Sequence, residues 1–437
     1  MNNELKDELQ RVLSDFFIYL KSKGIQIIHR YKNIIEFGNK KRTSGVIKAE
    51  YVTEPLFTII SYSTDYLEAV DTTALDRLLL QEYPLIKNYF DRQSDERVNT
   101  KNVIEGMIKS IYFEDPKMIS TKSLIEKAIL NFDKLVSSGK ARANIYYTVE
   151  NLDVPELLEK VEIDQDLFFV RLTEEQVNEY YEIEPASGFF NYELTALVLD
   201  YFEEMSNTEK RAGEGEKYLR EKEEQMNLFL NALTLSFGGG FGFHKMIHRY
   251  VDYYSNFNYG NSRSNLRTYA KGKTTLTINN LRESIEKYKK LKTKNLDPFK
   301  FSLNKLLEAE RRHGELDGIL DAVIGLEYLL LHQIGNPELR GETRFRFSLN
   351  YASLFEKKAR QEKRKLAQEA YDIRSKIVHG GEIKLREKFC NEELYIVQIS
   401  DKIIQMLRET LNILIDKLPG KTFYDENFWI EQALGLN

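Results

Sequence analysis

An arginine and a histidine five positions apart are the residues of this sequence best suited to chemistry. Arg374 and His379 lie in the segment AYDIRSKIVHGGE. Histidine exchanges a proton near neutral pH, and a guanidinium binds the oxygens of a phosphate group. On an unbroken helix the two side chains would lie roughly 140° apart and would not share a face. Gly380-Gly381 predicts that the helix ends at His379, which lets the ring turn back toward Arg374. The alternative is that both side chains merely cap carbonyl groups.

Three further side chains are candidates for supporting roles, and each has an ordinary structural alternative. Glu327 lies on the apolar stripe of a predicted helix, where a carboxylate needs a partner such as Arg374 or Arg346. It either orients that arginine or forms a structural ion pair. Tyr371 precedes Arg374 by one turn and either contacts a ligand or packs in the core. Ser375 either donates to a phosphate or bonds back to its own backbone.

The charge is unevenly distributed along the chain. The 437 residues carry a net charge of −5, yet residues 340–388 hold 14 Lys/Arg and only 7 Asp/Glu. A basic segment in an acidic protein is typical of a surface that attracts phosphate groups. Its ordinary interpretation is a solvated helix face.

The elements that carry these residues are predicted to be helices. Residues after Asp297-Pro298 show helical apolar spacing with short glycine-containing loops, which is typical of an antiparallel bundle. The predicted helices are 301–312, 315–332, 342–356, 360–379 and 393–418. Because the residue before proline avoids the helical region, Asp297-Pro298 is a natural boundary. We therefore predict a domain at 296–437.

The preceding residues 1–295 have mixed patterns, and a second division near residue 140 is an open alternative. Helical spacing predicts helices at 3–23, 73–91, 100–112, 122–137, 190–206 and 215–236. Glycine-punctuated or alternating runs predict strands at 24–31, 33–38, 44–52, 56–63, 143–150 and 167–172, and 243–254 and 274–278 lean toward strand. The fold class is therefore α+β, with a mixed N-terminal region followed by an all-α bundle.

The residues around the histidine resemble a known family. Arg374-Ser-Lys-Ile-Val-His379-Gly380 resembles the signature of HEPN domains, and the wider pattern Tyr371-x-x-Arg374-Ser375-x-x-Val378-His379-Gly380 is similar to the Apea-like HEPN group. The upstream helix ELDGILDAVIGLEYLLLH, with Glu327 at the acidic position, and the next one, RGETRFRFSLNYASLF, resemble that group as well. The resemblance covers residues 300–420, about a third of the chain.

The resemblance implies a metal-independent endoribonuclease that works as a homodimer, with two Arg/His motifs in one cleft. His379 would act as general base or acid, and Arg374 would hold the scissile phosphate. We expect no metal and no cofactor. The expected RNA-binding residues are Arg346, Lys363, Arg364 and Lys376.

The same resemblance implies that residues 1–295 sense a trigger or restrain the nuclease, as in prokaryotic antiviral defence against phage. One alternative is a non-catalytic RNA-binding or scaffold protein, which the acidic bulk of the chain favours. A second is a sensor whose active partner is another polypeptide. Co-purification of a stoichiometric partner would distinguish that one.

Composition and motifs exclude several other classes. Cys390 is the single cysteine, so the chain has no intramolecular disulfide and no CxxC pair, as expected for a cytoplasmic protein. No apolar run approaches the ~18 residues of a membrane span, and the N-terminus lacks a signal peptide pattern. SFGGGFGFHK matches neither a Walker A loop nor GxGxxG and is interpreted as a flexible turn. His244 and His248 lack the glutamate of HExxH, which argues against zinc.

Overall fold

The computed structural model divides the protein into two compact units. It describes residues 1–22, 29–36, 46–53, 65–83, 100–114, 121–138, 140–172, 195–204, 216–250, 260–262, 274–331, 342–417 and 426–435. The first unit comprises Met1–Val149, Leu157–Glu223 and Phe243–Ser264. The second comprises Glu150–Glu156, Glu224–Gly242 and Asn265–Asn437.

A cluster of helices forms one core of the first unit. The helices are α1 (Asn3–Ser22), α3 (Thr73–Glu82), α5 (Thr100–Glu114) and α6 (Thr121–Ser138). The apolar stripe that predicts a helix at 3–23 is buried in this core: Leu5, Leu9, Val12, Leu13, Phe16 and Leu20. The prediction of α1 is confirmed, and the helices predicted at 100–112 and 122–137 are present as α5 and α6.

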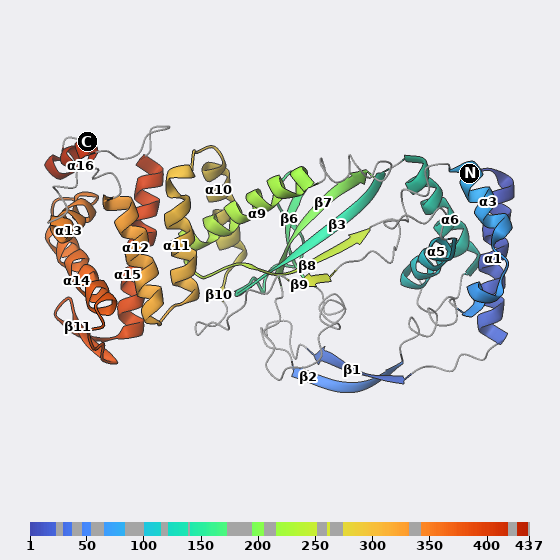
Figure 1. Cartoon of the computed structure of the whole chain (residues 1–437), viewed down its shortest axis with the longest axis horizontal. Coiled ribbons are helices and arrows are strands. Elements are labelled where there is room, and N and C mark those ends of the chain that lie inside the picture. Colours follow the sequence, from blue (N-terminus) through green and yellow to red (C-terminus); the bar gives the residue numbers. More distant parts are fainter. Residues whose placement is uncertain are drawn as a thin grey trace. The chain divides into compact units, whose positions relative to one another are not determined.

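A six-stranded antiparallel sheet forms the second part of this unit (Figure 1). The strand order is β5-β6-β7-β3-β8-β9. The bounds are β3 (Lys140–Val149), β5 (Val161–Asp164), β6 (Leu167–Arg171), β7 (Thr195–Glu204), β8 (Phe243–Tyr250) and β9 (Gly260–Ser262). A separate hairpin pairs β1 (His29–Glu36) with β2 (Val46–Thr53), so the described parts of the predicted runs 24–31 and 33–38 belong to one strand.

The helix predicted at 190–206 is wrong, because Thr195–Glu204 forms the strand β7. β7 lies between β6 and β3, and its residues 196–199 are all buried. A central strand covered on both faces has a continuous apolar run, which periodicity alone does not distinguish from a buried helix. The rest of the predicted helix lies outside the described residues.

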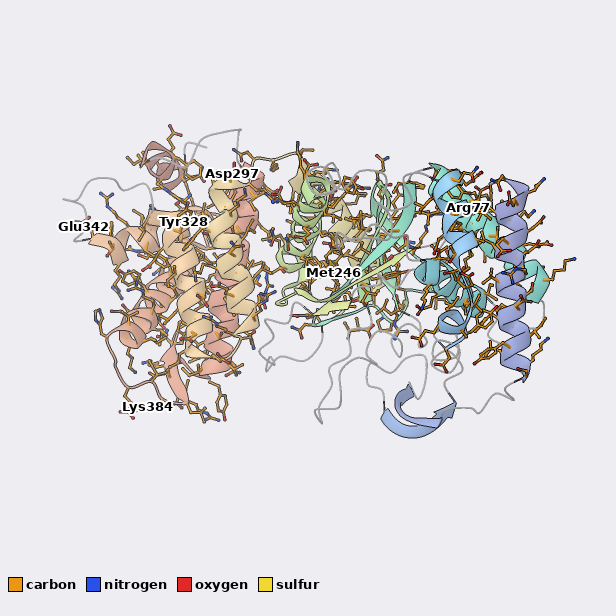
Figure 2. The ribbon with its side chains drawn as sticks, turned by 45° about the vertical axis from the view of Figure 1, so that its right-hand side comes forward. Arg77, Met246, Asp297, Tyr328, Glu342 and Lys384 are labelled. Carbon is orange, nitrogen blue, oxygen red and sulfur yellow. The ribbon has the colours of Figure 1, made fainter. Side chains whose placement is uncertain are left out.

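The second unit is a helical bundle that includes the end of α9 (Glu216–Phe237). The other helices are α10 (Ile278–Lys292), α11 (Lys300–Arg311), α12 (Leu316–Leu331), α13 (Thr343–Ser353), α14 (Arg360–Val378), α15 (Ile396–Lys417) and α16 (Glu426–Leu434). α12 contacts α11, α13, α14 and α15, so it occupies the centre of the bundle. Figure 2 shows Asp297 and Lys384 near opposite ends of this unit.

Four of the five C-terminal helix predictions agree with α11 to α14 within a few residues. The fifth is too long, since α15 begins at Ile396 and residues 393–395 belong to a β-hairpin of β11 (Arg386–Phe389) and β12 (Glu392–Tyr395). The sequence patterns also missed α10 and α16. The α+β fold class is confirmed by the sheet and the helical bundle together.

The predicted boundary at Asp297-Pro298 coincides with a local break in helix. A short 3-10 turn, η2 (Asp297–Phe299), places Pro298 at its first positions, where a missing N–H is tolerated. The compact second unit begins earlier in the chain and includes α10, which a capping box between Thr277 and Asn280 starts. That residues 296–437 form a domain by themselves stays a prediction.

Candidate functional site

α14 carries the Arg/His pair, and its end is built as the glycines predict. His379 is the last capping residue, and Gly380 follows it with φ +71°. The Gly380 N–H donates to the Ile377 carbonyl at 3.2 Å, and the Gly381 N–H donates to the Lys376 carbonyl at 2.8 Å. These two bonds define a Schellman motif, which satisfies carbonyl groups at a helix end. The prediction that the helix ends at His379 is confirmed.

His379 stands on this helix end with its side chain exposed to solvent. The backbone N–H of His379 donates to the Ser375 carbonyl at 3.0 Å, which is the last helical bond of α14. Within the described part of the chain, its ring makes no hydrogen bond or ion pair. The expected return of the ring toward Arg374 is therefore not a contact in this structure. The imidazole is thus exposed to solvent.

Arg374 is partly buried and paired across the bundle with Glu327 of α12. Its Nη2 donates to Glu327 Oε2 at 3.4 Å, and the side chains are 26% and 21% exposed. Burial raises the pKa of the Glu327 carboxyl, and the Arg374 guanidinium opposes this effect to a smaller extent. The buried Arg374 Nε has no hydrogen-bond partner among the described residues. The structure thus joins Glu327 to Arg374, as one of its two predicted partners, and leaves a donor of the guanidinium unused.

Of the two other supporting candidates, Tyr371 contacts the neighbouring helix α13, and Ser375 makes a backbone bond within α14. The Tyr371 hydroxyl lies 3.1 Å from Thr343 Oγ1, and its ring packs against Phe347 with centroids 5.5 Å apart. This arrangement agrees with the packing alternative for Tyr371. Ser375 is half-buried, and its carbonyl accepts the His379 N–H. It therefore helps to hold the residue that follows the helix.

Most of the predicted RNA-binding residues already have partners within the bundle. Lys363 Nζ lies 3.1 Å from Glu409 of α15, and it also lies over the Phe355 ring. The Arg364 guanidinium stacks 5.1 Å from the centroid of Phe345.

Lys376 pairs with Glu387 at 2.7 Å, and this contact holds the pKa of the Glu387 carboxyl below its ordinary value. Arg346 is half-buried on α13. With Lys363 and Arg364, these contacts show that part of the positive charge of residues 340–388 packs α14 against its neighbours.

The glycine-rich segment is not the flexible turn that the sequence suggests. Residues 238–242 are buried, and a Cβ on Gly238 would collide with the guanidinium of Arg408. Arg408 of α15 donates to Glu310 of α11 in a buried ion pair. The glycines thus allow close approach to a charged pair within the second unit. Side chains of His244 and His248 lie outside the described set.

The hairpin that follows α14 was missed for a local reason. Cys390 and Asn391 have φ values of +53° and +69°, so they form a two-residue turn of the kind that joins twisted strands. A Cys-Asn pair is a weaker turn signal than Asn-Gly. The only available sign was the Asn within a short polar stretch, and the apolar spacing of α15 extended over it.

No family model, curated protein or solved structure matches the chain. No three His, Cys, Asp or Glu side chains of the described residues come together as a group that could hold a metal ion. Among those same residues, no helix is long and apolar enough to cross a membrane.

Proposed function

We propose that the chain is a metal-independent endoribonuclease of the HEPN type that acts on RNA as a homodimer in the cytoplasm. The observation that carries the proposal is the end of α14. There an exposed histidine follows, by five residues, an arginine that Glu327 holds and that keeps an unused Nε donor. The Schellman motif fixes the position of this histidine on a rigid helix rather than on a loop.

The reaction needs only groups that this site and the substrate supply. One imidazole removes the proton from a ribose 2′-hydroxyl, whose oxygen attacks the adjacent phosphorus. The bond from phosphorus to the 5′-oxygen breaks, and the same histidine of the second copy gives that oxygen a proton. The products are a 2′,3′-cyclic phosphate and a 5′-hydroxyl. Because the nucleophile belongs to the substrate, proximity replaces a metal-activated water.

Arg374 would stabilise the charge that develops on the phosphate oxygens. A guanidinium in a partly buried setting interacts with such charge more strongly than it would in water. Glu327 limits the rotation of Arg374 through its ion pair. Tyr371 holds α14 against α13 through its hydroxyl contact with Thr343. The Ser375 carbonyl accepts the backbone N–H of His379 at the end of α14. Residues 1–295 would sense a trigger or restrain the nuclease, in a role such as prokaryotic antiviral defence.

A second candidate function is a non-catalytic RNA-binding or scaffold protein. Two observations favour it: the ion pair that occupies Arg374, and the intramolecular partners of Lys363 and Lys376. For catalysis, RNA must compete with Glu327 for the guanidinium. In a scaffold protein the same ion pair would only stabilise the bundle.

Cleavage of a mixed RNA pool in EDTA distinguishes the two functions. The full-length wild type is compared with His379→Ala and Arg374→Ala. Arg282→Ala serves as the control, because Arg282 is an exposed arginine of α10 in the same unit. We expect cleavage by the wild type and the control, products with 2′,3′-cyclic phosphate ends, and loss of cleavage in the two site variants.

Equal cleavage by all four proteins would refute the assigned site. RNA binding without cleavage, unchanged in His379→Ala, would favour the scaffold function. A deoxyribose at the position of cleavage is a further control, since it removes the 2′-hydroxyl. The proposal requires that such a substrate remains uncut.

A further inference from the structure

An exposed arginine and an exposed tyrosine face each other at the open end of the hairpin that follows α14. Arg386 of β11 and Tyr395 of β12 are directly paired across the strands. The guanidinium carbon of Arg386 lies 4.1 Å from the centroid of the Tyr395 ring, and Arg386 also donates to the tyrosine hydroxyl. Tyr395 is 39% exposed. A flat cationic surface stacked on an aromatic ring is thus presented to solvent.

Two contacts fix this hairpin along α14. The Cys390 N–H in the turn of the hairpin donates to Glu369, and Glu387 pairs with Lys376 at 2.7 Å. Glu387 also accepts the Lys384 N–H at 2.8 Å, which anchors the loop before β11. The hairpin therefore runs beside the last turns of the helix, with its turn toward the middle of α14 and its open end toward the helix C-terminus.

The spacing of these contacts places the exposed pair level with His379. From Glu369 to Lys376 a helix advances by about 10 Å, at about 1.5 Å per residue. From Cys390 back to Glu387 a strand advances by about 10 Å, at about 3.3 Å per residue. The two elements thus stay in step. One more strand residue, to Arg386, corresponds to about two helix residues, which is the height of Val378 and His379 on α14.

The chemistry of the pair favours a nucleobase as its ligand. Unpaired RNA bases stack on aromatic rings and on guanidinium planes, and such a contact is independent of base identity. Arg386 and Tyr395 offer both surfaces, and Lys384 beside them is exposed. Figure 2 shows Lys384 at the end of the helical unit, where the chain leaves α14 for the hairpin.

We propose that Arg386 and Tyr395 form a stacking platform that holds an unpaired base of single-stranded RNA at the level of His379 along α14. The inference rests on the proposed ribonuclease function for the identity of its ligand. The two residues position the substrate, while His379 and Arg374 act on the phosphate. Double-stranded RNA keeps its bases stacked within the helix, so it cannot use the platform.

Two substitutions separate stacking from charge in the full-length protein. Arg386→Lys keeps the positive charge but removes the planar group. Tyr395→Leu keeps an apolar side chain but removes the ring. Lys388→Ala is the matched control, because Lys388 lies on the same exposed face of β11 but one strand repeat farther from the level of His379. Circular dichroism and thermal unfolding verify that each variant is folded.

Binding and cleavage are measured with a labelled single-stranded RNA of mixed sequence and with its duplex. Binding uses the His379→Ala background, and cleavage uses chains with His379 intact. We expect Arg386→Lys and Tyr395→Leu to weaken single-strand binding by roughly 5-fold to 100-fold, the range for one stacked base. Duplex binding should change by less than about 3-fold, as should all binding by Lys388→Ala, which loses one surface charge.

The outcomes separate this proposal from the ribonuclease function. Unchanged single-strand binding and cleavage in both platform variants, with cleavage lost in His379→Ala, would overturn the platform alone. If the wild type binds RNA but never cleaves it, and the two platform variants bind RNA more weakly, the platform is supported and the nuclease function is rejected. A wild type that neither binds nor cleaves RNA would reject both. A shift in size-exclusion elution of the variants without an RNA effect would overturn the platform in favour of contact between copies of the chain.

Discussion

The helical unit contains the dipeptide His-Gly at two helix ends, and the two histidines differ in every tertiary contact. His313-Gly314 follows α11, and His379-Gly380 follows α14. Both glycines have positive φ, +84° and +71°, respectively. In each case the chain leaves a helix through a conformation that favours glycine. The two sites share the His-Gly dipeptide and a left-handed glycine, but His379 is the C-cap of α14, whereas His313 lies one residue beyond Arg312, the C-cap of α11.

The surroundings of the two rings are opposite. His313 is 9% exposed, its Nε2 bonds to Asp401 of α15, and the Gly314 N–H donates to Ser400 Oγ at 3.4 Å. His379 is exposed and, within the described residues, has no side-chain partner. A buried and paired histidine stabilises a helix junction. A histidine held rigidly in solvent is able to exchange protons with a substrate. Cover by α15, rather than the His-Gly signal, therefore separates the environments of the two rings. Under the proposed function, it also separates a structural histidine from a catalytic one.

The largest effect should come from replacing the exposed histidine. His379→Ala should lower the rate of RNA cleavage by roughly 100-fold to 10,000-fold, the usual contribution of general acid–base catalysis. The free energy of unfolding should change by less than about 0.5 kcal/mol, because an exposed ring with no partner supports little structure. Single-turnover cleavage assays and urea unfolding measure the two quantities. A large loss of stability with unchanged cleavage would reverse the comparison.

Replacing the buried histidine should have the opposite signature. His313→Ala should reduce the free energy of unfolding by about 1–3 kcal/mol, because it removes packing and a hydrogen bond to a carboxylate. Cleavage per folded molecule should stay near the wild-type rate at low temperature. Asp401→Asn keeps a hydrogen-bond acceptor for the ring and should cost less. If His313→Ala abolished cleavage in a fully folded protein, the catalytic assignment would belong to both histidines.

Replacing the two glycines should have a smaller effect on the free energy of unfolding than the largest expected for His313→Ala. Ala at Gly380 should cost about 1–2 kcal/mol from the left-handed backbone alone, since an added Cβ would meet nothing within 4 Å. Gly380→Asn should cost less, because asparagine adopts this conformation more readily. Gly314→Ala should have a similar cost, as its Cβ would make only an ordinary contact with Val397 at 3.4 Å. Cleavage should respond at Gly380 only; equal responses at both glycines would indicate a general loss of structure.

The sequence predicts well the features that depend on neighbours along the chain. The buried stripe of α1, the order of α11 to α14 and the helix end at His379 all follow from apolar spacing and from Gly380-Gly381. The sequence also predicts a cation beside Glu327, because a carboxylate on an apolar stripe requires one. It leaves Arg374 and Arg346 as alternatives, and the structure pairs Glu327 with Arg374.

Features that depend on distant residues could not be predicted from the same patterns. β7 is a strand because β6 and β3 pair with it on its two sides, and Gly238 is needed because the Glu310–Arg408 pair lies against it. The apolar spacing of α15 also extends over residues 393–395, so these residues were predicted as helix although they belong to the hairpin. Lys363 and Arg364 illustrate the same limit for the site: their charges suggest a ligand, but Glu409 and Phe345 already contact them. Periodicity contains no information about which charges pair in the folded chain.

The smallest expected effect concerns Glu327, the carboxylate that pairs with Arg374. It tests whether the ionised Glu327 carboxyl lowers the free energy of unfolding. Burial raises the pKa of Glu327 in the folded state, with Arg374 as the weaker, opposing influence. The folded chain therefore holds this proton more tightly than the unfolded chain does. The contribution of Glu327 to the free energy of unfolding is therefore fully present below the pKa that Glu327 has in the unfolded chain. It is lost as the pH rises through the pKa that Glu327 has in the folded chain.

Glu327→Gln cannot ionise, so its free energy of unfolding should rise relative to the wild type as the pH increases from about pH 4. The trend should be larger when both proteins carry Arg374→Ala, because the guanidinium that favours the ionised Glu327 carboxyl is then absent. Urea unfolding at several pH values measures both differences. A relative stability that falls with pH would mean that the Glu327–Arg374 pair is net stabilising. The end of α14 would then resemble the His313–Asp401 junction in function as well as in local sequence.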